Sequence, residues 1–272
     1  MIKTLVNQLR QYGRAVLRRT SSEDPYSSAA VVDEFLALEK LLPAEQIIYE
    51  RLSGWLSGKS VLDVGVGAGR TSEAFGERTG RYLGVDYSHE MIAACERRFS
   101  GAGNRFEFRV ADARNIQQLG GPWDLIFFSF NGIDHLDATD RTKFFHDVRT
   151  MLAPSGMFWF SSHNIRSLPT LYKLRIKEGS SAKEWAYGVF SWLLIRLVNP
   201  SRRKLAGQPH AMVNDGALGF GVRGYYGTPQ ETTQQLKQNG FDTVLIFGMD
   251  GRELQPEESF LCTDIWLTYL CS

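Results

Sequence analysis

Residues 61–70 read Val-Leu-Asp-Val-Gly-Val-Gly-Ala-Gly-Arg, and this stretch decides the fold. Its apolar start is typical of a strand that is buried on both faces. Three glycines at alternate positions, Gly65, Gly67 and Gly69, then predict a tight turn, because glycine has no Cβ and accepts a positive φ. A helix expected over residues 70–78 would begin at this turn with free backbone N–H groups, so a ligand could approach the backbone closely.

Two residues distinguish this turn from other nucleotide-binding loops. A dinucleotide fingerprint requires G-x-G-x-x-G, but Arg70 stands at the third glycine position. The carboxylate of Asp63 would repel a pyrophosphate and attract an ammonium or sulfonium group. The G-K-[ST] sequence of a P-loop is absent. The turn therefore favours a ligand that carries a positive charge.

Composition limits the class of protein. The chain has 272 residues, enough for one large α/β domain or for one domain with a substantial insertion. Its 31 basic and 30 acidic side chains leave a net charge of +1, so we expect no nucleic-acid partner. Cys95, Cys262 and Cys271 lie far apart in the sequence, which argues against a zinc site or a disulfide framework, and no metal is expected.

The N-terminal residues carry no targeting signal that we recognise. Residues 1–20 are basic and weakly amphipathic, and we interpret them as a terminal helix that packs on the body of the protein, with membrane association as the alternative. They lack the apolar core and cleavage site of a signal peptide, and no apolar run of the chain is long enough to span a bilayer. We expect a cytoplasmic protein without a membrane partner.

Short apolar runs alternate with helical stretches along most of the chain, which predicts a parallel sheet with helices on both faces. The sequence thus predicts a Rossmann-like, doubly wound α/β fold with a mostly parallel sheet of seven strands. The expected strands are 60–65, 81–86, 106–110, 123–129, 156–162, 243–247 and 260–270. The expected helices of this part begin at Ser88 and cover 138–152 and 229–239.

Two segments interrupt this alternation. Residues 1–58 are expected to form an N-terminal helical lid, with two helices parted by Pro43. Residues 164–226 are expected to form a helical cover with helices near 171–176 and 184–198, because so long a structureless loop would be improbable in a compact domain. The ligand-binding domain then comprises residues 59–163 and 227–272.

Polar residues follow the predicted strands, where open parallel sheets bind their ligands. Asp86 lies 21 positions beyond Gly65 and is placed to accept hydrogen bonds from ribose hydroxyls, a feature that NAD sites share. Asp112 and the N–H of Ala113 could bind an adenine. Tyr87 and Met91 are expected to enclose the ring, although Met91 also fits an ordinary core position. The stretch with Ser129, Asn131, Asp134 and His135 follows strand 123–129, where ligand and acceptor should meet.

Taken together, these residues resemble a known family. Asp63-x-Gly65-x-Gly67-x-Gly69 is similar to the first motif of class I S-adenosylmethionine-dependent methyltransferases, and the strand ends follow that family in order and spacing over residues 60–162. The resemblance implies S-adenosylmethionine as cofactor. It also implies that Asp63 and the glycine backbone hold the aminocarboxypropyl part, Asp86 the ribose, and Asp112 with Ala113 the adenine.

The resemblance extends to a subgroup of the family. Residues 131–134 resemble the corresponding loop of bacterial small-molecule methyltransferases. Asn214-Asp215-Gly216 and Tyr225-Tyr226 look like a segment of methyltransferases from polysaccharide and secondary-metabolite clusters. The N/D-P-P-[FYW] signature of DNA and protein amide methyltransferases is absent. A small-molecule acceptor, methylated on oxygen or nitrogen, is therefore expected.

Methyl transfer is an in-line displacement, so the enzyme must align the acceptor and, for a hydroxyl, supply a base. His135 and His163 are the candidate bases, with His210 as a further one. The candidates for binding the acceptor are Tyr26, Asp134, Asn164, Tyr225 and Tyr226, with Tyr172 and Tyr187 as additional aromatic side chains.

Two alternatives remain open from the sequence. The same fold could use another carbon of the sulfonium, as in cyclisation or aminopropyl-type transfer with release of methylthioadenosine. The chain could also be a cofactor-binding partner subunit that turns over no acceptor.

Overall fold

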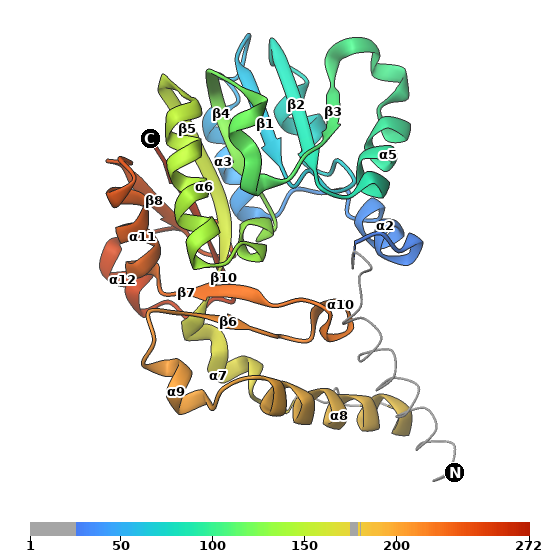
Figure 1. The fold of residues 1–272 in the computed structure, drawn as a ribbon, viewed down its shortest axis with the longest axis vertical. Helices are drawn as coiled ribbons and strands as arrows, with labels where there is room; N and C mark the ends of the chain where they lie inside the picture. The colour runs from blue at the N-terminus through green and yellow to red at the C-terminus, as the bar shows by residue number, and fades with distance from the viewer. Residues whose placement is uncertain (1–25, 175–178, 180) are drawn as a thin grey trace.

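A computed structural model describes residues 26–174, 179 and 181–272 (Figure 1). The expected helix over residues 1–20 lies outside this part of the chain. The sheet has ten strands among the described residues, in the order β3-β2-β1-β4-β5-β10-β8-β9, with β6 and β7 attached beside β5. The strands are β1 (Ser60–Val64), β2 (Arg81–Asp86), β3 (Glu107–Val110), β4 (Trp123–Phe128), β5 (Leu152–Asn164), β6 (His210–Val213), β7 (Gly224–Gly227), β8 (Val244–Phe247), β9 (Glu253–Leu254) and β10 (Trp266–Cys271).

The helices connect and cover these strands. They are α2 (Ala29–Leu36), α3 (Pro43–Leu52), α4 (Ser72–Gly76), α5 (His89–Arg98), α6 (Ala138–Met151), α7 (Leu168–Leu171), α8 (Ala182–Val198), α9 (Arg202–Ala206), α10 (Ala217–Phe220), α11 (Pro229–Gln238) and α12 (Pro256–Leu261). Short 3₁₀ helices are η1 (Ser100–Arg105), η2 (Ala113–Leu119), η3 (Gly132–His135) and η4 (Ile165–Ser167). None of the described helices is long and apolar enough to cross a membrane.

The predicted mixed α/β sheet is confirmed. Strands β1 to β5 pair in parallel, and β10 joins β5 and β8 in antiparallel orientation. All seven expected strands are present, and the three additional ones, β6, β7 and β9, are short. Two of these three come from the segment that the sequence predicts to be helical.

Alternate side chains of each central strand enter two different hydrophobic clusters, as the two-residue period of a strand requires. Leu62 of β1 and Ile126 of β4 pack in the cluster that contains α6 and α11. Val61 and Phe127 point to the opposite face and pack against α3 and α4. The result is a three-layer arrangement in which the edges of the central strands are paired and both faces are covered, so only the strand ends are open to a ligand.

The C-terminal segment corrects one boundary. The last strand was expected over 260–270, but residues 256–261 form α12 and the strand begins at Trp266. Pro256 at the first helical position and a capping box between Gln255 and Glu258 start this helix, and such a cap outweighs the apolar character of Phe260 and Leu261.

The insertion after β5 is only partly helical, which corrects a second prediction. The helix expected at 184–198 is present as α8. Of the helix expected at 171–176, Leu171 ends α7, residues 172–174 are not helical, and residues 175–176 lie outside the described part of the chain. Strands β6 and β7 pair with each other in antiparallel orientation, and β7 pairs in parallel with the end of β5, His163 with Tyr226. Figure 1 shows this hairpin between the body of the sheet and α8.

Candidate functional site

The glycine-rich turn connects β1 to α4 at the carboxyl end of the sheet. The backbone N–H of Gly67 donates to Asp86 Oδ2 at 3.0 Å, and the N–H of Ser88 donates to Asp86 Oδ1 at 2.9 Å. The carboxylate at the end of β2 therefore holds the turn that follows β1. Ser88 in turn caps α5 by accepting from the N–H of Met91.

Two positions in the turn require glycine. Gly65 has a φ of +64°, and a Cβ there would stand 2.3 Å from the ring of Phe128 at the end of β4. Gly67 has a φ of +54°, and a Cβ there would stand 3.1 Å from the ring of Phe35 in α2. The turn is thus packed between the end of β4 and the N-terminal helix α2.

Asp63 is fully buried behind this turn. Its Oδ2 accepts hydrogen bonds from the hydroxyls of Thr71 at 2.6 Å and Tyr82 at 2.7 Å. Its Oδ1 has no hydrogen-bond partner among the described residues. Burial raises the pKa of Asp63 to about 7, although the two hydroxyls act in the opposite direction. An unpartnered buried oxygen of this kind fits a cationic ligand, which would stabilise the ionised carboxylate.

Arg70, which replaces the third glycine of a dinucleotide loop, is held by α3. Its guanidinium forms a two-pronged ion pair with Glu45, in which Nη2 lies 2.8 Å from Oε1, and both side chains are largely buried. The guanidinium also lies 5.4 Å from the centre of the Phe130 ring. Helix α3, the glycine turn and the turn after β4 are therefore fixed to one another.

A narrow cleft separates α2 from the glycine turn and the turn after β4. In the latter turn Phe130 and Asn131 have positive φ values of 50° and 59°. The N–H of Asn131 donates to Ser161 Oγ at 2.8 Å, and its buried Oδ1 has no partner among the described residues. The residues that line the cleft are Phe35, Leu38, Gly65, Val66, Gly67, Ala68, Arg70, Thr71, Ser129 and Phe130.

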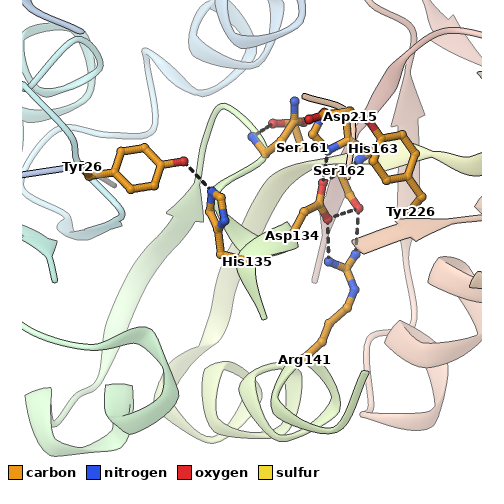
Figure 2. Close-up of polar contacts among 10 residues, drawn as sticks. Tyr26, Asp134, His135, Arg141, Ser161, Ser162, His163, Asp215 and Tyr226 are labelled. Atoms are coloured by element: carbon orange, nitrogen blue, oxygen red, sulfur yellow. Dashed lines mark hydrogen bonds and ion pairs between the residues drawn. The ribbon is translucent and has the colours of Figure 1, made fainter. Parts of the chain in front are cut away.

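Asp134 is the centre of a buried polar network beyond β4 and β5 (Figure 2). Its Oδ1 accepts from Ser162 Oγ at 2.6 Å and from Arg141 Nη1 at 3.1 Å. Its Oδ2 accepts from the backbone N–H of His163 at 2.7 Å and from His163 Nδ1 at 2.8 Å. Arg141 Nη2 also donates to Ser162 Oγ at 3.1 Å. This carboxylate, expected to bind the acceptor, is instead occupied in orienting His163.

The environment of His163 sets its protonation. Burial lowers its pKa, but the hydrogen bond and the charge of Asp134, together with the charge of Asp215, outweigh burial, so the pKa rises above the ordinary 6.5. The Nδ1 donates to Asp134, so Nε2 is the atom that can exchange a proton with a substrate. The ring stacks on Tyr226 of β7 with centres 4.6 Å apart.

His135, the other candidate base, meets the N-terminal segment. Its Nε2 lies 2.7 Å from the hydroxyl of Tyr26, as Figure 2 shows. Although the side chain reaches the surface, the surrounding protein desolvates it and lowers its pKa, against the influence of Asp134. Tyr26 also makes edge contacts with Tyr87 and Phe35, at ring-centre distances of 6.0 and 5.9 Å. Tyr26 therefore links the strand ends of β2 and β4.

Tyr226 and Asp215 come from the insertion. The hydroxyl of Tyr226 donates to Asp215 Oδ2 at 2.9 Å. The charge of Asp215 acts to raise the pKa of His163 and of His135, although burial outweighs it at His135. The hairpin thus brings an acidic group to the candidate bases, and residues 135, 163, 215 and 226 form one polar cluster (Figure 2).

Six other predicted residues have surroundings that do not depend on a ligand. Met91 is buried with Val31 and Val32 of α2, which matches the core alternative. Asp112 forms an ion pair with Arg114, and Ala113 packs against the main core. Asn164 is buried, with its Nδ2 donating to the carbonyl of Cys262 at 2.9 Å. Tyr225 is fully buried over the guanidinium of Arg141, 4.6 Å from its ring centre, and Tyr87 is exposed.

Several residues that shape the site were not among the predicted ones. Arg141 is fully buried, but an arginine on an amphipathic helix is indistinguishable in sequence from a surface residue. Ser161 and Ser162 could have been predicted to belong to a polar network, because two consecutive hydroxyls in a buried strand need hydrogen-bond partners. The sequence contains no such indication for Glu45 and Phe35, since their partners lie far away in the sequence. None of the groups of His, Cys, Asp or Glu in the described part of the chain could hold a metal ion.

Comparison with known proteins agrees with this geometry. Residues 61–156 match the sequence model of a methyltransferase domain. A probable S-adenosylmethionine-dependent methyltransferase of Mycolicibacterium smegmatis is 25% identical over 44% of this chain and 44% of its own length. A ubiquinone biosynthesis O-methyltransferase of Nitrosomonas europaea is 30% identical over 52% of this chain and 59% of its own length. The chain thus spans about half the length of the curated relatives that it matches.

Solved structures share the fold over nearly the whole chain. A S-adenosylmethionine-dependent methyltransferase of Clostridium acetobutylicum superimposes with a TM-score of 0.59, 15% identity and coverage of 90% of this chain and 96% of the other. The CcbJ methyltransferase of Streptomyces caelestis gives a TM-score of 0.59, 15% identity and coverage of 92% and 98%. Residues 61–156 therefore carry a methyltransferase domain, and this part of the chain is similar to S-adenosylmethionine-dependent methyltransferases.

Proposed function

We propose that this protein transfers the methyl group of S-adenosylmethionine to an oxygen or nitrogen atom of a small molecule. The observation that carries the proposal is the placement of two groups on the same edge of the sheet. The glycine turn with the unpartnered Asp63 oxygen follows β1, and the Asp134–His163 pair lies beyond the neighbouring β4 and β5. The glycine turn is suited to binding a sulfonium cofactor, and the Asp134–His163 pair is suited to accepting a proton from the substrate.

The cofactor would be held by residues of the first three strand ends. S-adenosylmethionine supplies an electrophilic methyl group on a positively charged sulfur. The backbone of the glycine turn and Asp63 would hold its amino acid part. Asp86 is positioned at the end of β2 for the ribose, and Ala113 offers a backbone N–H to the adenine. Asp112 would exchange its contact with Arg114 for one with the adenine amino group.

His163 would act as general base toward an acceptor hydroxyl. Its Nε2 accepts the proton while Nδ1 remains bonded to Asp134, whose charge stabilises the imidazolium that forms. His135 has a lowered pKa and a bond to Tyr26, so it is better suited to positioning than to proton removal. The O-methyltransferases among the relatives support an oxygen acceptor.

The acceptor would be enclosed by two segments. Residues 26–58 cover the glycine turn through α2, and residues 164–226 place Tyr226 and Asp215 beside His163. An acceptor between these segments would meet one acidic group, two imidazoles and several aromatic rings. Such a pocket fits a small polar aromatic or amine-bearing molecule.

Cofactor binding tests the ribose assignment. We expect Asp86→Ala to weaken S-adenosylhomocysteine binding by about 1–3 kcal/mol, the cost of unpaired ribose hydroxyls, measured by titration calorimetry. Asp124→Ala is the matched control, because Asp124 also accepts a backbone N–H, that of Ser60, but at the opposite end of β1. Equal affinity in the wild type and in Asp86→Ala would remove the assignment.

Turnover tests the reaction. Incubation of the full chain with S-adenosylmethionine and a panel of phenols, alcohols and amines should give methylated product and S-adenosylhomocysteine by mass spectrometry. Release of methylthioadenosine from S-adenosylmethionine alone would mean that the protein performs cyclisation or aminopropyl chemistry instead of methyl transfer. Tight binding without turnover of any acceptor would point to a cofactor-binding subunit.

A further inference from the structure

Helix α8 of the insertion is apolar on all sides, yet it is poorly covered. Of its 17 residues only Ile195 is buried. Trp185, Leu193 and Leu197 are 53%, 46% and 79% exposed. Helices that are hydrophobic all round are normally buried in a protein core or in lipid. The exposed face of α8 is therefore suited to a partner that takes up apolar side chains.

The position of α8 leaves this face accessible. Figure 1 shows α8 on the side of the β6–β7 hairpin away from the sheet. Among the described residues, Trp192 Nε1 and Arg196 Nη2 donate to the carbonyl of Tyr172 at 3.0 and 3.1 Å, and Ile195 packs in a small cluster with Leu205. The exposed side chains are thus separated from the proposed cofactor site.

Charge in the chain is concentrated on the same segment. Residues 164–226 contain ten basic and three acidic side chains, although the whole chain has a net charge of only +1. Arg202, Arg203 and Lys204 are exposed in α9, directly after α8, and Lys183 is exposed at its start. Within the described ranges none of these four basic side chains forms an ion pair. Apolar and basic side chains together match the chemistry of an anionic lipid surface.

We propose that α8 and α9 dock on the surface of a membrane that contains anionic lipid, with the apolar side chains of α8 in the interface and the α9 cations at the headgroups. Trp185 is of the residue type that favours this interface. A second copy of the chain would bring two positively charged surfaces together, and a nucleic acid would leave the apolar face without a partner. The sequence alone predicts no membrane partner, and the exposure of α8 is the observation that changes this.

Residues 1–20 support the same choice of partner. They contain five basic and no acidic side chains, and a segment of this composition is attracted to an anionic lipid surface. Binding of this type is peripheral, which agrees with the lack of a described helix that could span a bilayer.

Flotation with lipid vesicles tests the proposal on the full chain. We expect binding to vesicles of phosphatidylcholine with roughly one third phosphatidylglycerol and little binding to pure phosphatidylcholine, decreasing as salt is added. The double variant L193S/L197S should lower the partition coefficient at least about 10-fold, because two leucines no longer enter the interface. L261S is the matched control, since Leu261 of α12 is also 79% exposed but lies outside the insertion.

The charge is tested separately. The triple variant R202Q/R203Q/K204Q should lower binding to the anionic vesicles on the order of 100-fold, at roughly fivefold for each of the three cations near the surface. Absence of vesicle binding by the wild type would overturn the proposal. An equal loss of vesicle binding in L261S would also overturn it. A third contrary result is a dimer in size-exclusion chromatography that L193S/L197S dissociates, while vesicle binding is absent. S-adenosylhomocysteine binding should be the same in all these variants, which separates this test from that of the proposed function.

Discussion

His163 can take a proton only at Nε2, because its Nδ1 lies 2.8 Å from Asp134 and donates to that carboxylate. If this atom is the base, His163→Gln should lower kcat for a hydroxyl acceptor by about 10²–10⁴-fold and leave S-adenosylhomocysteine affinity unchanged. Steady-state kinetics and calorimetry measure the two effects. His146→Gln, an exposed histidine on α6, is the control. An activity of His163→Gln equal to that of the wild type would assign the proton transfer to another group.

Asp134 sets the pH at which His163 is neutral. Because the pKa of His163 is raised above 6.5, kcat/KM should fall as the pH decreases through that pKa, where the imidazole becomes charged. Asp134→Asn removes the charge that stabilises the imidazolium, so the acidic limb of the profile should move to lower pH. Because Arg141 loses its ionic partner, folding must be checked by urea unfolding. A limb that stays at the same pH would show that Asp134 does not control this titration.

At the scale of single residues, local patterns predicted the glycine-rich turn after β1 and its neighbour Asp86. Gly65, Gly67 and Asp86 are together because a strand–turn–helix unit is encoded within about thirty consecutive residues. Asp134 was predicted to lie in the acceptor region, but its partners Arg141 and Ser162 come from α6 and β5. The sequence therefore shows that a carboxylate is present, whereas the fold decides whether substrate or protein occupies it.

Helix α2 is the element that covers the cleft. Phe35 packs over Gly67, and Tyr26 bonds to His135. If this helix closes over the bound cofactor, Tyr26→Phe should raise the dissociation rate of S-adenosylhomocysteine by about 3- to 10-fold, the loss of one hydrogen bond. Stopped-flow displacement measures the rate. Tyr49→Phe on α3 is the control, as Tyr49 packs on Phe75 away from the cleft. Equal dissociation rates in the wild type and Tyr26→Phe would exclude closure of this kind.

Elements with strong periodicity were predicted, and those that depend on pairing were not. Strand β1 and helix α8 follow from their composition alone. The β6–β7 hairpin was missed because its strands have four residues each and become stable only by pairing with β5. Helix α12 was missed because its cap overrides an apolar sequence. For the hairpin, the deciding interaction lies far away in the sequence, whereas for α12 it is the local capping box between Gln255 and Glu258.

For the molecule as a whole, the sheet concentrates polar groups at one edge and leaves one of them in an unfavourable state. Asp63 has a pKa of about 7 in the folded protein and 3.8 ordinarily. Between these values the folded state binds more protons than the unfolded state, so stability falls as the pH rises through this range. By about pH 8 the free energy of unfolding is lower by on the order of 4 kcal/mol, since each unit of pKa difference corresponds to about 1.4 kcal/mol.

This cost predicts how the unliganded protein responds to Asp63→Asn. The substitution keeps an acceptor for Thr71 and Tyr82 but removes the buried charge. The variant should gain stability relative to the wild type as the pH rises from about 5 to about 8, measured by urea unfolding, and should bind S-adenosylhomocysteine more weakly. Asp124→Asn, in which the replaced carboxyl has a lowered pKa, should show no such gain over this range. Parallel stability curves for the wild type and Asp63→Asn would mean that Asp63 is not strained in the folded chain, and the affinity for a cationic cofactor would then have to come from the glycine turn alone.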